Sequence, residues 1–125
     1  MRTKAPFLLL CFLSGCVTAQ PVSPLEFSCG DVVVVGRIKT VGATPVQGSD
    51  PLPNWLSEYQ LQIQIKRIIR GSEHRRVVPA SVTAHAQIRG DRDFLIVLTP
   101  DGAGGYALAT ADLMQFRPKL SESCS

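Results

Sequence analysis

The sequence predicts an all-β fold, a small five-stranded barrel followed by a short C-terminal tail or helix. Five short apolar segments succeed one another at hairpin spacing, glycine and proline cluster between them, and no segment shows a long helical periodicity. The length of 125 residues allows one domain. A hydrophobic content of 45% with 18% charged residues is typical of a chain with a packed core and excludes a disordered polyelectrolyte.

The first two predicted strands enclose a long loop. Residues 31–41 begin with a run of four valines, which indicates burial on both faces, and Gly36 marks a bulge or a bend. Residues 42–57 contain three prolines and two glycines and predict the loop. Residues 58–70 alternate between apolar and polar side chains, which predicts a strand with one wet face that carries Gln60, Gln62 and Gln64.

Three further strands complete the prediction. Residues 77–86 form the third, in which Pro79 indicates a sheet edge or a bulge. Residues 94–99 are apolar on both faces and predict a central strand. A glycine-rich turn leads to the fifth strand at residues 106–111, and the tail that follows is expected to be a short helix or irregular.

The N-terminal segment resembles a bacterial lipoprotein signal peptide. Arg2 and Lys4 precede nine apolar residues, which cover about 14 Å as a helix and are too short to span a bilayer. A lipobox-like motif follows, Leu13-Ser14-Gly15-Cys16. In a lipobox the cysteine carries the lipid and becomes the first residue of the mature chain, so the resemblance implies an acylated (palmitate-type) Cys16 and a membrane anchor.

This resemblance divides the chain and implies its location. Residues 1–15 are the signal peptide, residues 16–28 the lipidated N-terminus and tether, and residues 29–125 the β domain. Position 17 is not the aspartate associated with inner-membrane retention, so the resemblance implies the outer membrane with the domain in the periplasm. The alternative is a soluble secreted or periplasmic protein cleaved after Val17-Thr18-Ala19.

Four cysteines occur, and two of them remain for the folded domain. Cys11 lies in the signal peptide and Cys16 is consumed by the lipid. Because the exported chain folds in an oxidising compartment, Cys29 and Cys124 are expected to form a disulfide. Closing a loop of about 95 residues stabilises a fold by roughly 4–5 kcal/mol in the chain-entropy model.

A family resemblance covers residues 29–71. A cysteine precedes the valine-rich strand, and the second strand contains a tyrosine, alternating aliphatic residues, then basic residues and a glycine. These features resemble the netrin-like branch of the OB-fold, to which tissue inhibitors of metalloproteinases also belong, and imply an OB-like barrel. The inhibitors chelate a protease zinc ion through the free α-amino group of an N-terminal cysteine, which Cys29 lacks because a tether precedes it.

The sequence predicts no catalytic activity, cofactor or metal site. His74 and His85 have no partner at a spacing typical of a catalytic triad or a metal pair. Asp91, Asp93 and Asp101 flank the fourth strand, where turn formation and charge balance explain them.

Two features are candidates for binding. The segment 66–76 has a net charge of +4 and carries Glu73 together with Lys66, Arg67, Arg70, Arg75 and Arg76. The single tryptophan, Trp55, either plugs the barrel or anchors a protein partner. Nucleic acid is not expected, because aromatic residues are not interleaved with these charges and the net charge falls to +1 without Arg2 and Lys4.

These observations predict a non-catalytic, lipid-anchored periplasmic module that binds or inhibits a protein partner in the cell envelope, of an immunity or assembly type. The alternative is a binder of an anionic glycan or oligosaccharide that uses the basic hairpin at residues 66–76. The partner and the oligomeric state are not predicted.

Overall fold

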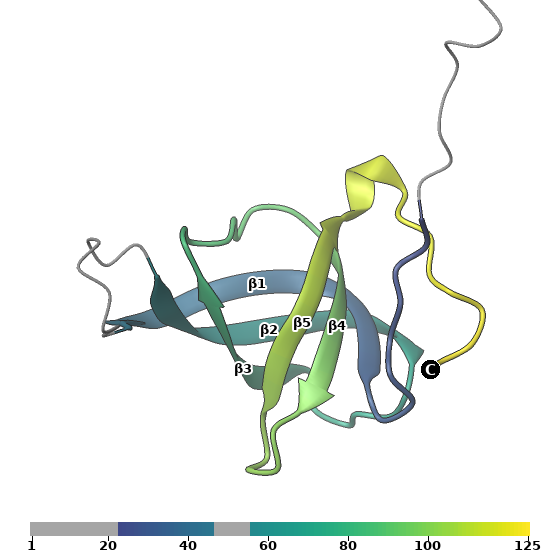
Figure 1. The fold of residues 1–125 in the computed structure, drawn as a ribbon, viewed down its shortest axis with the longest axis horizontal. Coiled ribbons are helices and arrows are strands. Elements are labelled where there is room, and N and C mark those ends of the chain that lie inside the picture. The colour runs from purple at the N-terminus through teal and green to yellow at the C-terminus, as the bar shows by residue number, and fades with distance from the viewer. Residues whose placement is uncertain (1–22, 47–55) are drawn as a thin grey trace, which may run out of the picture.

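Five strands close into a barrel in the computed structural model, which describes residues 23–46 and 56–125 (Figure 1). The strands are β1 (Val32–Pro45), β2 (Ser57–Arg70), β3 (Val77–Ala84), β4 (Phe94–Pro100) and β5 (Tyr106–Leu113), and a short 3-10 turn, η1 (Met114–Phe116), follows. The order around the barrel is β1-β2-β3-β5-β4. Only β3 and β5 are parallel, and they pair at just two positions. The fold is the all-β, OB-like barrel that the sequence predicts.

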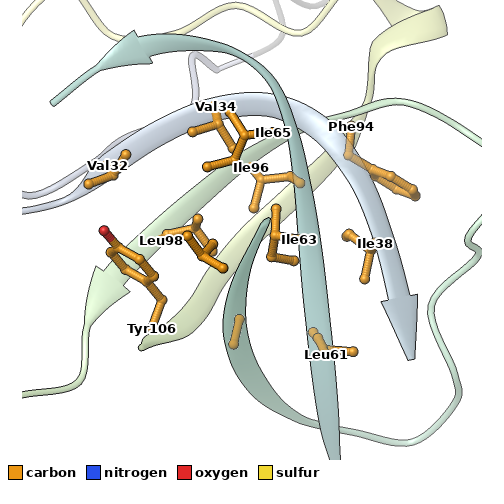
Figure 2. Close-up of a cluster of buried hydrophobic side chains, with 12 residues drawn as sticks. Val32, Val34, Ile38, Leu61, Ile63, Ile65, Phe94, Ile96, Leu98 and Tyr106 are labelled. Atoms are coloured by element: carbon orange, nitrogen blue, oxygen red, sulfur yellow. The ribbon is translucent and has the colours of Figure 1, made fainter. Parts of the chain in front are cut away.

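The valines of β1 are buried on both faces, as predicted. Val32 and Val34 point into the barrel, where Figure 2 shows them with apolar side chains from β2, β4 and β5. Alternating residues of β2 (Leu61, Ile63 and Ile65) fill the same interior, which we call the inner cluster. The central strand β4 contributes Phe94, Ile96 and Leu98 to it. The period-two pattern of β2 therefore directs its aliphatic side chains inward.

Val33 and Val35 point outward and are covered by the two ends of the chain. They form a second, outer cluster with Leu95 and Val97 of β4 and with Phe27 from the N-terminal segment. Figure 1 shows the N-terminal segment and the C-terminal tail running beside each other. The Leu25 amide donates to the Lys119 carbonyl at 2.7 Å, and the Leu25 carbonyl accepts from Ser121 at 2.9 Å. Residues 23–28, expected in the tether, thus pack on the barrel, with Phe27 buried.

The predicted disulfide joins these two ends. Cys29 and Cys124 are bonded, with their Cα atoms 4.8 Å apart. The turn that leads from Ser28 into β1 is held by Asp31, whose side chain is buried. Its carboxylate accepts from the Ser28 amide at 2.8 Å and from the Thr99 hydroxyl at 2.9 Å. The disulfide and these hydrogen bonds fix the N-terminal segment over the outer cluster.

A bulge lies at Gly36, as predicted. The β1–β2 register shifts between Val35 and Gly36, and a Cβ atom at position 36 would overlap the carbonyl oxygen of Gln64. Glycine is therefore required by a close approach of backbones. The same shift leaves Lys66 opposite no β1 residue, because Gly36 pairs with Ile65 and Val35 with Arg67.

Several predicted element boundaries are corrected. β1 continues to Pro45 because its far half pairs with the start of β2, so the connecting loop is shorter than the predicted 42–57. β3 ends at Ala84 rather than at residue 86. Pro79 is not at a bulge, since β2 pairs with β3 without a register shift, and it lies just outside the two positions, Ala80 and Ser81, at which β3 pairs with β5. β5 continues to Leu113 rather than ending at residue 111, and the tail after it forms the single turn η1 and is otherwise irregular, within what the sequence predicts.

Removing the disulfide should destabilise the barrel without changing its fold. We expect the Cys29→Ala/Cys124→Ala double variant to lose about 4 kcal/mol of unfolding free energy, because the bond restricts the unfolded chain across 95 residues. Urea unfolding followed by circular dichroism measures this loss. Coinciding midpoints for the oxidised wild type and the variant would contradict the stabilising role.

Candidate functional site

The outer surface of β1 and β2 carries amide and cationic side chains side by side. The inward direction of Leu61, Ile63 and Ile65 directs the alternate glutamines of β2 outward. Across the β1–β2 ladder Gln62 pairs with Lys39 and Gln64 pairs with Arg37. Paired residues of an antiparallel ladder lie on the same face, so each of these amides is next to a cation. We call this surface the amide–cation face, made of Arg37, Lys39, Gln60, Gln62, Gln64, Lys66 and Arg76.

Two shallow hollows lie on this face and share Arg37 and Gln64. The first has a volume of about 370 Å³ and extends from β1 toward the β3–β4 connection, lined by Arg37, Ile38, Lys39, Thr40, Gln64, Gln87, Ile88 and Gly90. The second has a volume of about 530 Å³ and extends toward the start of β3, lined by Arg37, Gln64, Ile65, Lys66, Arg76 and Val77. Side chains of both hollows are therefore within reach of one extended ligand.

Asp93 joins two of the cations. Its carboxylate accepts from Arg37 Nε at 3.0 Å and lies 2.9 Å from Lys66 Nζ. The hydrogen bonds from Lys66 and then Arg37 hold the pKa of Asp93 below its ordinary value. All three side chains are at least one-third exposed, so the network contributes little stability, but it orients Arg37 and Lys66. Lys39 and Arg76 form no salt bridge within residues 23–46 and 56–125, which leaves their charges available to a ligand.

The turn between β2 and β3 is held by the half-buried carboxylate of Glu73. Glu73 accepts from the Arg75 side chain at 2.9 and 3.0 Å, from the Arg75 amide at 2.8 Å and from the Tyr106 hydroxyl at 2.7 Å. These bonds, those of Arg75 first, lower the pKa of Glu73 far below its ordinary value. Burial and the bond to Glu73 raise the pKa of Tyr106. Arg75 is thus an internal partner of the turn rather than an unpaired surface charge.

The structure divides the five basic residues of the 66–76 segment. Lys66 and Arg76 line the second hollow of the amide–cation face. Arg67 and Arg70 pair with Val35 and Val33, whose side chains belong to the outer cluster, so these two arginines lie toward the covered side of the barrel. Arg75 binds Glu73. The segment is therefore not one uniform positive patch.

Two candidate residues lie outside the described part of the chain. They are Cys16, the expected lipid acceptor, and Trp55, the expected anchor or plug. The neighbouring residue Leu56 is 39% exposed.

Sequence reasoning missed the contribution of β1 to this face. Arg37 and Lys39 follow Gly36 at alternate positions, and this spacing, together with the glutamine alternation in β2, was the available signal. The pairing of Asp93 with two distant cations had no local signal, because it joins residues 27 and 56 positions apart.

The described residues carry no sign of a metal centre or a membrane span. Within residues 23–46 and 56–125, no cluster of three or more His, Cys, Asp or Glu side chains could hold a metal ion. In the same residues no helix has the length and apolar character needed to cross a bilayer.

Comparisons of the chain with protein-family models, with curated proteins and with solved structures gave no match.

Protonation of Glu73 should weaken the fold in acid. Because folding lowers the pKa of this group, its stabilising contribution is present above the ordinary value of 4.5 and is lost as pH falls below it. We expect the loss of unfolding free energy between pH 7 and pH 3 to be smaller by about 1–2 kcal/mol in Glu73→Gln than in the wild type. Urea unfolding at the two pH values measures it.

The control for this prediction is Glu122→Gln. Glu122 is exposed and has no side-chain hydrogen bond or salt bridge within the described ranges, so this variant should follow the wild type. Equal acid sensitivity of Glu73→Gln and the wild type would contradict the assigned role of Glu73.

Proposed function

We propose that the protein is a non-catalytic, lipid-anchored binding module of the bacterial envelope that captures an acidic protein partner on its amide–cation face. The observation that carries this proposal is the alignment of Arg37 and Lys39 with Gln64 and Gln62 across two neighbouring strands. Cations attract carboxylates over a distance, and side-chain amides then donate and accept hydrogen bonds at short range.

Apolar side chains at the margins of the face favour a protein as the ligand. Val77 lines the second hollow beside Arg76 and is 47% exposed, and Val41, two residues beyond Lys39, is 52% exposed. Protein interfaces combine apolar contact area with polar and charged groups. An acidic protein surface with a few apolar residues is complementary to this combination.

An anionic glycan is the second candidate. The two hollows, with amide and cationic side chains along their walls, have the size of small-ligand sites, and OB-folds bind oligosaccharides on the outer face of β2 and β3. The nearby Tyr59 packs against the inner cluster, so its ring does not supply a stacking surface. A glycan would therefore be held by hydrogen bonds and charge, with Lys66 and Arg76 as its contacts in the 66–76 segment.

The anchor and the family relationship belong to this proposal. Acylation at Cys16 would place the domain at the periplasmic side of the outer membrane, and the alternative is a soluble exported protein. A netrin-like relationship is supported by the OB-like strand order and by Cys29 at the start of the barrel. Zinc-protease inhibition is not part of the proposal, because packed residues precede Cys29, which therefore has no free α-amino group to chelate the metal.

Charge reversal on the amide–cation face should abolish partner capture. We expect Lys39→Glu/Arg76→Glu to weaken retention of the partner at least about tenfold, because two attractive contacts become repulsive. The matched control is Arg67→Glu/Arg70→Glu, which changes the net charge equally at the other end of the β1–β2 ladder, beside the covered residues Val33 and Val35. Pull-down from a detergent-solubilised envelope fraction, with mass spectrometry, measures capture.

The same variants distinguish the two ligands. Purified lipopolysaccharide is the glycan probe, titrated by calorimetry. Loss of lipopolysaccharide binding with protein capture unchanged would favour the glycan. Protein capture and lipopolysaccharide binding that are both equal in the two charge-reversal variants would contradict the assignment of the face.

Trp55→Ala tests whether the tryptophan is an anchor for the partner. As an anchor, its removal should weaken capture by about 2 kcal/mol or more and leave the melting temperature unchanged, because anchor residues contribute mainly to the bound state. Thermal unfolding and the same pull-down measure the two effects. A large fall in melting temperature would instead identify Trp55 as part of the core.

A further inference from the structure

An apolar hollow lies where the N-terminal segment joins the barrel, at the end opposite the β4–β5 turn. We call it the tail hollow; its volume is about 410 Å³ and it is lined by Ser23, Phe94, Ala111, Asp112, Leu113, Phe116, Pro118 and Lys119. Figure 1 shows η1 at the end of β5, next to the start of the described N-terminal segment. The tail hollow is separate from the amide–cation face, since the two surfaces share no lining residue.

Phe116 projects from this site into solvent. Its exposed fraction of 73% is the largest among the large apolar side chains of residues 23–46 and 56–125. The turn that carries it is fixed: the Met114 amide donates to the Asp93 carbonyl at 3.0 Å, the Arg117 amide donates to the Met114 carbonyl at 2.9 Å, and Met114 packs on the outer cluster. One side chain of η1 is therefore held against the barrel while Phe116 is directed away from it.

Cations flank the exposed aromatic ring. Arg117 follows Phe116 directly, and Lys119 lines the tail hollow. Neither forms a salt bridge within the described ranges. Asp112 is the single carboxylate on the lining and balances Lys119, so Arg117 beside the hollow makes the local charge positive. An aromatic ring beside two basic side chains suits the boundary of a phospholipid bilayer, where the ring enters the acyl region and the cations contact phosphates.

The position of the proposed anchor favours the membrane as the ligand of the tail hollow. Ser23 lines the tail hollow, and only residues 16–22 separate it from the lipid. Seven residues span at most about 25 Å even when fully extended, so this end of the barrel stays close to the bilayer. The tether expected from the sequence was longer, because Leu25 and Phe27 were not expected to pack on the barrel.

We infer that the tail hollow and Phe116 form a membrane-contact surface, with Phe116 in the phospholipid interface and Arg117 and Lys119 at anionic headgroups. This inference rests on the proposed lipid anchor. It orients the domain with η1 toward the bilayer, and the end of β1 and the start of β2 then extend away from η1 (Figure 1). The inference goes beyond the proposed function, because it assigns the phospholipid bilayer to the tail hollow in addition to the protein partner on the amide–cation face.

Fluorescence quenching tests the contact. The purified mature lipoprotein carries Trp55→Phe, which removes the single native tryptophan, together with Phe116→Trp, and it is reconstituted into phosphatidylethanolamine–phosphatidylglycerol vesicles with brominated acyl chains. We expect blue-shifted emission that loses about half its intensity, because the indole lies within the acyl boundary. The matched control is Trp55→Phe with Ala103→Trp, an exposed site in the β4–β5 turn at the other end of β5, and its emission should be unchanged.

Two further measurements separate the possible failures. Intact mass reports acylation at Cys16, which tests the proposed anchor independently of the contact. An acylated protein in which the Phe116→Trp variant is not quenched overturns the membrane-contact surface and leaves the proposed function standing, as would be the case if a protein covers the tail hollow. Equal quenching of the Phe116→Trp and Ala103→Trp variants also overturns it. The membrane-contact surface is supported if only the Phe116→Trp variant is quenched and if its quenching falls at least about twofold when Arg117→Gln/Lys119→Gln is added.

Discussion

Burial of β1 on both faces is the constraint on which the rest of this structure depends. A barrel strand normally has one face toward the interior and one toward solvent. Val33 and Val35 lie on the outer face and are nevertheless buried, because both ends of the chain cross over them. The disulfide and the buried Asp31 hold those ends in place. The termini are therefore structural parts of the barrel rather than appendages.

This arrangement separates two surfaces with different chemistry. Where the termini cover β1, the outer surface is apolar and closed, and the chain enters beside the exposed ring of Phe116. Beyond the bulge at Gly36 the termini no longer cover β1, so its outward residues become Arg37 and Lys39. A single strand thus supplies packing area at one end and cations at the other. The proposed membrane contact belongs to the first surface and the proposed acidic ligand to the second.

Charges near one another in the sequence differ in their chemical availability once the chain is folded. Arg75 and Arg76 are neighbours, but Arg75 is bonded to Glu73 whereas Arg76 lines a hollow. Lys66 stands opposite no β1 residue, because of the register shift, and reaches Asp93. A count of basic residues predicts the net charge of a segment correctly but cannot predict which charges are already paired. Pairing depends on which strands the barrel closure brings together.

The sequence by itself determined the number and order of the strands, the burial of the valine run on both faces, a bulge or bend at Gly36 and the Cys29–Cys124 pair. The strands follow from period-two alternation, which is a local pattern, and the disulfide follows from the number of cysteines left for the domain. Neither needs information about the tertiary structure. Only the tertiary structure decided what covers Val33 and Val35, which cations share a face with the glutamines, and where Phe116 lies relative to the N-terminal segment. Each of these depends on contacts between residues distant in sequence, whose register and direction are fixed only when the barrel closes.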